Sequence, residues 1–436
     1  MSDIDDLLSQ TIETCQMPGA QLCVMTRDET FFVQAGFANP DTWMPVSEKT
    51  RFQLGSTTKP MIAFLAHQFA EAGKLDLKAP VSTYLHDQPD SSLLKNSDIN
   101  TEILLSHTSG LCGDAFLDLG DSHAAETALI KAVSALPELH AAGKDTSYCN
   151  VGFVVCAEIL RTISGQHWSD LFRTSITKQI DSETVNPWPE READNLASGH
   201  TNNEPVERSN LSLSNAAAGT TLIGTARDLC EFGKLVLDSL EGEGPLSVAS
   251  AESMTSLIAP LAPNERGLGF GHGMMIYSQD PFVFGHDGLT IGQQAYLRVF
   301  PERGVCVAFL GNGGDMRSAV KQIFEALSSL TGSSLQPPVF ESRNADFESG
   351  VYERNNASLV IERGEETTSL SVLNKEPWAA DLYGEVEGPY ELSTHTDGGT
   401  YIYKSGSSVP YRVHFTDNAA YLGMRRYNKM DGPSWS

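Results

Sequence analysis

The chain has 436 residues and a hydrophobic content of 40%, enough for two or three domains that each bury a core. Its 30 basic and 56 acidic residues give a formal charge of -26, which repels phosphate backbones and anionic lipid surfaces, so nucleic-acid and membrane partners are not expected.

Strand and helix patterns alternate along the first three quarters of the chain. Residues 17–39 read as two strands around a turn, and residues 281–314 read as three more. Between them the pattern is mostly helical. In "MIAFLAHQFAEAG" the apolar residues Ile62, Leu65, Ala66 and Phe69 recur at helical spacing, and Gly73 is placed to end the helix.

After the Pro-Pro of "SSLQPPVF" at residues 333–340 the helical pattern nearly vanishes. Short alternating runs such as "SLVIE", "TSLSVL", "TYIYK" and "YRVHF" follow, with turn residues between them, and about eight strands fit into this tail. We therefore predict two domains, at residues 1–335 and 336–436, the second being an antiparallel β-barrel or sandwich.

Cysteine usage and the N-terminus bear on the compartment. The seven cysteines form an odd number without metal-ligand spacing, so we expect buried free thiols and neither a disulfide framework nor a metal site. The acidic start "MSDIDDLLSQ" lacks a secretory signal, and "GLGFGHG" lacks the spacing of a dinucleotide site. We expect a cytoplasmic protein that uses no cofactor.

The stretch "GSTTKP", residues 55–60, carries the chemistry. Because Pro60 is tolerated only in a first helical turn, the helix should begin near Ser56, which places Ser56 and Lys59 on one face. Burial and the positive helix end both lower the pKa of an ammonium, so Lys59 can accept the Ser56 hydroxyl proton. By itself this motif is also common as a solvated helix start.

Four more segments occur in the order and approximate spacing of one family. They are "ILLSHTSGL" at 103–111, "DTSYCNVGF" at 145–153, "NAAAGTTLIGTARDLCEFG" at 215–233 and "FGHDGLTIG" at 284–292. Together with "GSTTKP" they resemble the penicillin-binding-protein-like serine hydrolases, which include class C β-lactamases, D-aminopeptidases, esterases and peptide-cyclising thioesterases. The resemblance covers about residues 5–330. It implies an α/β sandwich with an inserted helical subdomain, and the tail resembles the lipocalin-like barrel appended to some of these enzymes.

The resemblance also implies roles for individual residues. Ser56 would be the acylated nucleophile and Lys59 its base, while Tyr148 would pass protons to the leaving group. Asn150 would hydrogen-bond Lys59 and the substrate amide. Gly288 would let the substrate backbone approach, and the N-H groups of Leu289 and Ser56 would form the oxyanion hole.

His286 departs from the family pattern, because it stands where many relatives have the lysine of a Lys-Thr-Gly motif. A lysine offers a fixed positive charge to a carboxylate such as that of penicillins, whereas histidine is near neutral at pH 7. β-Lactam hydrolysis is therefore disfavoured. His107 reads as a structural residue of its turn, Cys149 and Cys156 as packed thiols, and His200 and His272 as either site or core residues.

We therefore predict a serine hydrolase that forms an acyl-enzyme from an ester or amide, in particular a peptide containing D-residues. One alternative is acyl transfer to an internal amine, as in peptide-cyclising thioesterases, and another is a non-catalytic acyl sensor or scaffold. The expected partner is a small-molecule or peptide acyl substrate. Homo-oligomerisation stays open, and the barrel would wall off part of the site or mediate such assembly.

Overall fold

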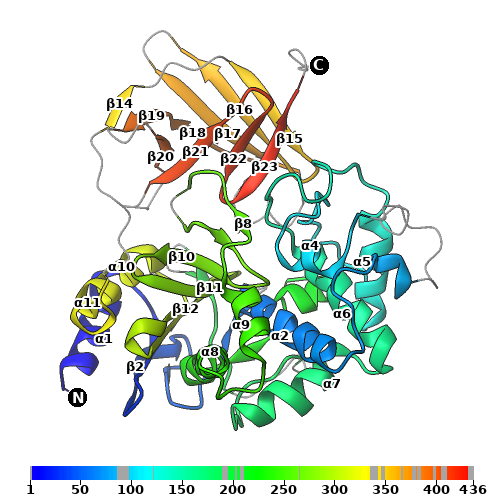
Figure 1. The fold of residues 1–436 in the computed structure, drawn as a ribbon. Coiled ribbons are helices and arrows are strands. Elements are labelled where there is room, and N and C mark those ends of the chain that lie inside the picture. Colours follow the sequence, from blue (N-terminus) through cyan, green and yellow to red (C-terminus); the bar gives the residue numbers. More distant parts are fainter. Residues whose placement is uncertain are drawn as a thin grey trace.

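The structure is a computed structural model that describes residues 2–85, 98–120, 122–188, 195–201, 204–206, 211–264, 266–333, 342–344, 349–364, 367–375, 380, 384–395, 399–403 and 410–430. Figure 1 shows two parts, a larger α/β part that holds the N-terminus and a barrel formed by the C-terminal strands. The predicted boundary between residues 335 and 336 lies outside the described residues.

The larger part is built on an antiparallel sheet that joins both ends of this segment and contains the strands predicted at residues 17–39 and 281–314. The early strand β1 pairs with the late strand β13, with Leu22 opposite Phe309. In order across the sheet the strands are β3 (Met44–Pro45), β2 (Thr30–Asn39), β1 (Gly19–Met25), β13 (Val305–Gly311), β12 (Gln293–Phe300), β11 (Phe282–Thr290), β10 (Met275–Gln279), β9 (Gly269–Phe270) and β8 (Ala259–Pro260).

Helices cover both faces of this sheet. On β1, Leu22 and Val24 belong to the core under the terminal helices, whereas Cys23 and Met25 belong to the core on the opposite face. This two-sided burial explains the uninterrupted apolar run of β1. The described helices are α1 (Ser2–Thr14), α2 (Thr58–Glu71), α4 (Thr101–Leu105), α5 (Ala124–Val133), α6 (Asn150–Ser164), α7 (Trp168–Phe172), α8 (Ala226–Leu240), α9 (Val248–Thr255), α10 (Met316–Ala326) and α11 (Ser328–Thr331).

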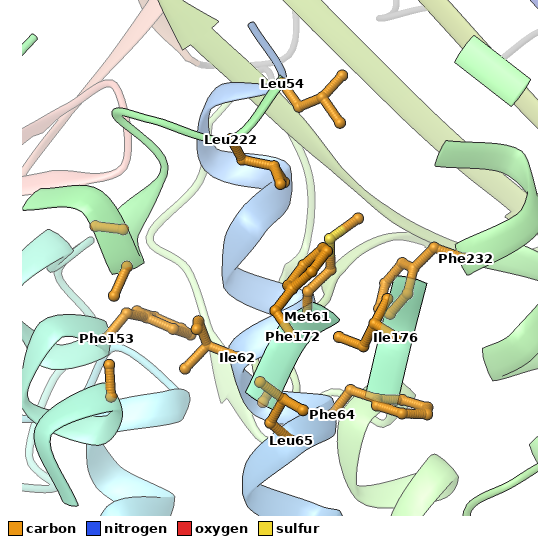
Figure 2. Close-up of a cluster of buried hydrophobic side chains, with 14 of the residues drawn as sticks. Leu54, Met61, Ile62, Phe64, Leu65, Phe153, Phe172, Ile176, Leu222 and Phe232 are labelled. Atoms are coloured by element: carbon orange, nitrogen blue, oxygen red, sulfur yellow. The ribbon is translucent and has the colours of Figure 1, made fainter. Parts of the chain in front are cut away.

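Helix α2 lies at the centre of the larger part. The sequence predicts one buried stripe on it, but every residue from Thr58 to His67 is buried. Figure 2 shows why: Phe153 of α6, Phe172 of α7 and Phe232 of α8 approach α2 from different directions. A helix surrounded in this way buries polar residues of its first turn together with the apolar ones. Lys59 is therefore held inside the core.

The C-terminal segment forms a single antiparallel sheet that curves into a nearly closed, lipocalin-like barrel (Figure 1). Ten of its strands are described, more than the eight expected, because some have only three residues and are too short to show alternation. Their order is β14 (Ser342–Asn344), β19 (Ser393–His395), β20 (Thr400–Ile402), β21 (Tyr411–Phe415), β22 (Ala419–Leu422), β23 (Arg425–Lys429), β15 (Gly350–Arg354), β16 (Ala357–Arg363), β17 (Thr368–Asn374) and β18 (Val386–Glu391).

All seven cysteines are free and buried, as predicted. Among the described helices, none combines the length and the apolar character needed to cross a membrane.

Candidate active site

Ser56 lies in a 3₁₀ turn, η1 (Gly55–Thr57), that runs directly into α2. The hydroxyls of Thr57 and Thr58 donate to the carbonyls of Leu54 and Gly55, which fixes this turn from within. The Lys59 Nζ lies 2.9 Å from the Ser56 Oγ. The predicted pairing of hydroxyl and amine on one turn is therefore present at hydrogen-bonding distance.

Burial governs the charge of Lys59. Its side chain is completely buried, and Nζ donates to the Ala218 carbonyl at 2.6 Å. Aromatic rings flank Nζ, with the centroid of Tyr148 at 4.9 Å and that of Phe153 at 5.7 Å. Desolvation lowers the pKa of Lys59 well below its ordinary value, opposed in part by the Asp114 carboxylate. The amine is thus available as a base.

Tyr148 lies just before α6 and faces the same amine. Its ring stacks on the His107 ring with 4.3 Å between the centroids, and His107 Nδ1 accepts from the backbone N-H of Cys149 at 3.0 Å. Burial raises the pKa of the Tyr148 phenol, although a hydrogen bond with the Ser56 hydroxyl opposes the rise. Tyr148 therefore remains protonated at neutral pH and can relay a proton, whereas it is a poor primary base.

Asn150 differs from the expectation. Its side-chain amide donates to the Asp114 carboxylate at 2.7 Å, while Lys59 bonds to Ser56 and Ala218. Within the described part of the chain, the expected hydrogen bond between Asn150 and Lys59 is therefore not formed. A carboxylate is a stronger acceptor than a neutral amine, which explains why the Asn150 amide turns toward Asp114.

Strand β11 brings His286 to the same place. Its Nδ1 lies 2.6 Å from the Asp287 carbonyl, which can only accept, so Nδ1 carries the proton and Nε2 carries the lone pair. Desolvation is the largest cause that lowers the pKa of His286, to about 3. The imidazole is therefore neutral at pH 7, and its Nε2 can accept a hydrogen bond but not donate one.

The glycines explain how β11 approaches η1. A Cβ atom on Gly288 would lie 1.9 Å from the Leu54 carbonyl oxygen, so only glycine fits there. Gly55 has a φ of +57°, and a Cβ atom on it would lie 2.7 Å from the Leu289 nitrogen. The backbone nitrogen of Leu289 thus lies beside the residue that precedes Ser56, as an oxyanion hole formed with the Ser56 N-H requires.

Asp114 is the residue that sequence reasoning missed. It is buried, and besides Asn150 it binds two arginines from the barrel, Arg354 at 2.7 Å and Arg425. These arginines hold the pKa of Asp114 well below its ordinary value despite the burial. No local motif marks the cluster, since Arg354 and Arg425 are separated from Asp114 by 240 and 311 residues.

The other residues considered in the sequence have structural partners. His107 holds its turn, as predicted, and Cys149 accepts from the Gly152 N-H at the start of α6. His200 contacts the Asn312 carbonyl, and His272 pairs with His67 inside the core. In the portion of the chain that the structure describes, no group of three or more His, Cys, Asp or Glu residues could hold a metal ion.

Comparisons with known proteins agree with this arrangement. A family model described as Beta-lactamase matches residues 4–329. Penicillin-binding protein 4 of Amycolatopsis lactamdurans is 31% identical over 363 residues, which span 78% of this chain and 93% of that protein.

Solved structures show the same fold. SurE with D-Leu superimposes with a TM-score of 0.76 at 22% identity, covering 98% of this chain and 99% of that chain. D-amino acid amidase from Ochrobactrum anthropi SV3, complexed with D-phenylalanine, gives a TM-score of 0.65 at 21% identity and covers 75% and 98%. The likeness to SurE thus includes the barrel, whereas the amidase matches about three quarters of the chain.

Proposed function

This chain belongs to the beta-lactamase family and is a serine hydrolase, and from that premise we propose that Ser56 is the nucleophile that becomes acylated. The observation that carries the proposal is the 2.9 Å separation of the Ser56 Oγ and a completely buried Lys59 Nζ. A buried neutral amine next to a hydroxyl is the arrangement that activates a serine. A non-catalytic scaffold would have no need of it.

The proposed proton path rests on the lowered pKa of Lys59 and the raised pKa of Tyr148. The neutral Lys59 takes the proton from the Ser56 hydroxyl while Oγ forms a bond to the substrate carbonyl carbon, and the N-H groups of Ser56 and Leu289 stabilise the oxyanion. As the bond to the leaving group breaks, its atom receives a proton from Tyr148, which is replenished from Lys59. In deacylation, water or an amine attacks the acyl carbon and gives its proton to the same pair, and that pair returns the proton to the Ser56 Oγ as the bond between Oγ and the acyl carbon breaks.

The proposed substrate is an ester or amide, in particular a peptide with a D-residue. Neutral His286 provides no fixed charge for a penicillin-type carboxylate, and its Nε2 suits an N-H donor of a peptide. Two proteins that share this fold carry a D-amino acid in their names, D-amino acid amidase and SurE with D-Leu, and the amidase has structures with D-phenylalanine and with L-phenylalanine. These observations support D-residues as the acyl component.

Acyl transfer to an amine, with cyclisation of the peptide as one case, is the second candidate. Lys59, Tyr148 and His286 are buried whereas Ser56 is half-buried, which favours it, because an amine can reach the acyl group while the proton carriers stay shielded from water. Mass spectrometry of the products from p-nitrophenyl esters, D- and L-aminoacyl amides and peptidyl thioesters separates the two candidates. A cyclic or amine-coupled product identifies transfer, and a free acid identifies hydrolysis.

The nucleophile itself is tested with a fluorophosphonate probe. The probe should add to the peptide that contains Ser56, and Ser56→Ala should abolish the labelling. Ser239→Ala is the control, because it removes a serine hydroxyl away from the site, a buried one that donates to the Leu235 carbonyl in α8. Labelling that persists in Ser56→Ala would identify a different nucleophile and reject the proposal.

A further inference from the structure

We propose that the barrel completes the active site: Arg354 and Arg425 clamp Asp114, and Asp114 in turn positions Asn150. This inference rests on the proposed function and adds to it, because it makes three residues outside the known motifs positioning residues for acylation. The barrel would then hold catalytic residues in place, which is a different role from walling off the site or mediating oligomerisation.

The contacts around Asp114 form a continuous link between the two parts of the chain. One carboxylate oxygen accepts from the Asn150 amide at 2.7 Å, and the other accepts from Arg354 at 2.7 Å and from Arg425. The Asn356 amide donates to the backbone carbonyl of Asp114 at 3.0 Å. Asp114 and Arg354 have side chains that are 4% and 1% exposed, so water contributes little to these bonds.

The barrel also holds Tyr148, through the start of β23 and the turn before it. The turn between β22 and β23 places the Met424 carbonyl where it accepts the backbone N-H of Tyr148 at 3.0 Å. The Arg425 guanidinium lies 5.1 Å from the centroid of the Tyr148 ring. One turn of the barrel therefore contacts the predicted proton carrier directly and the predicted substrate-binding amide through Asp114.

Electrostatics explains why the barrel arginines are needed. A buried carboxylate is stable only when it is paired, and the ion pairs of Asp114 in the described residues come from the barrel. If they were lost, Asp114 would hold an uncompensated charge or take up a proton. In either case its oxygen would no longer be fixed, and Asn150 would lose the partner that sets its orientation.

The interface contains a matched pair for comparison. Asp145, like Asp114, is a carboxylate of the larger part that binds an arginine of β23: Arg426 at 2.5 Å, with Tyr421 as a second donor. Asp145 has no hydrogen bond to Asn150 or Lys59 among the described residues. Substitutions of Asp145 and Arg426 therefore weaken the same interface without touching the link through Asp114.

The experiment measures acylation of Ser56 by a fluorophosphonate and kcat/KM for a p-nitrophenyl ester in the full-length chain. Asp114→Asn and Arg354→Met should lower both rates about 30-fold or more, because a misplaced substrate-binding group can cost on the order of 10²-fold. Arg354→Lys, which keeps the charge, should recover part of the loss. Asp145→Asn and Arg426→Met should stay within about threefold of the wild type.

The pH profile separates positioning from a merely structural effect. The charged groups that act on the Lys59 pKa are Asp114, which raises it, and Arg425, which lowers it, with a smaller effect of Cys149. His107 and His286 also face Lys59, but both have lowered pKa values and are neutral. The acidic limb should therefore move to lower pH in Asp114→Asn and to higher pH in Arg425→Met.

The outcomes are distinct. Wild-type rates in Asp114→Asn, or equal losses in Arg426→Met and Arg354→Met, would overturn the inference while leaving Ser56 as the nucleophile. The inference would also be overturned if the acidic limb of the pH profile moved in the same direction in Asp114→Asn and Arg425→Met. If the wild type itself is not labelled at Ser56, the proposed function fails instead. Because Arg425 is 29% exposed, Arg425→Met is the variant to use if Asp114→Asn does not fold.

Discussion

Replacing Lys59 and Tyr148 singly and together tests whether they act as one proton-transfer unit. Tyr148→Phe removes only the hydroxyl, because the ring that stacks on His107 and packs against Phe270 is retained. Lys59→Met keeps the volume of the buried stem, but it leaves the Ala218 carbonyl without its donor, a cost of about 1–3 kcal/mol in stability. Both variants should therefore fold well enough for kinetics.

The loss of rate in the double variant shows whether Lys59 and Tyr148 act as one unit or independently. A positioned proton carrier contributes on the order of 10²- to 10⁴-fold. If Lys59 and Tyr148 acted independently, the double variant would lose the product, on the order of 10⁴- to 10⁸-fold. Since the structure places both on the Ser56 hydroxyl, we expect the double variant to lose little more than the more damaging single variant.

The assay is single-turnover acylation by a p-nitrophenyl ester, followed by release of nitrophenol. Tyr296→Phe is the control, because it deletes another buried hydroxyl, one that donates to Gln294 at 2.6 Å in β12. It should leave acylation unchanged. Multiplicative losses in the double variant would refute the shared proton path, and so would a Tyr296→Phe variant as slow as Tyr148→Phe.

Two further predictions concern His286. His286→Lys should raise kcat/KM for a penicillin relative to that for a neutral ester, because it supplies the fixed charge that the neutral imidazole lacks, and an unchanged ratio would remove the reason for disfavouring β-lactams. Acid should also destabilise the fold through His286, whose pKa of about 3 in the folded protein lies below the ordinary 6.5. Its contribution to the free energy of unfolding is therefore complete above pH 6.5 and is lost as the pH falls toward 3. Between pH 8 and pH 5, this group should lower the free energy of unfolding measured in urea by about 2 kcal/mol. In His286→Gln the decrease between these pH values should be smaller by that amount. Equal decreases in the two proteins would contradict the assignment.

Most of the candidate site was predictable because its residues lie in local motifs. Ser56 and Lys59 share one turn, Tyr148 and Asn150 flank one helix start, and His286 lies on one strand. Strand periodicity likewise predicted the strands at both ends of the larger part, and the family resemblance implied the sandwich in which they share one sheet. Patterns of this kind are set by neighbouring residues, so they are visible in the sequence.

The remainder depended on contacts between distant segments. Asp114 looks like an ordinary loop residue, and Arg354 and Arg425 lie in short alternating strands with no sign of a buried partner. The complete burial of the first turns of α2 was also hidden, because it arises from α6, α7 and α8 packing around it. The orientation of Asn150 follows from Asp114, which explains why its expected bond to Lys59 was wrong.

Burial assigns both proton-transfer roles in this site through a single physical cause. Removing an ionisable group from water favours its neutral form, which lowers the pKa of an ammonium and raises that of a phenol. Lys59 and Tyr148 are buried side by side, so the first is available as a base and the second stays protonated. The covering layer is therefore part of the chemistry: the aromatic rings of Phe153 and Phe270 and the barrel turn at Met424 keep water from both groups. A change that admits water there would move both pKa values toward their ordinary ranges, which would protonate Lys59 and remove the base, whereas Tyr148 would stay protonated.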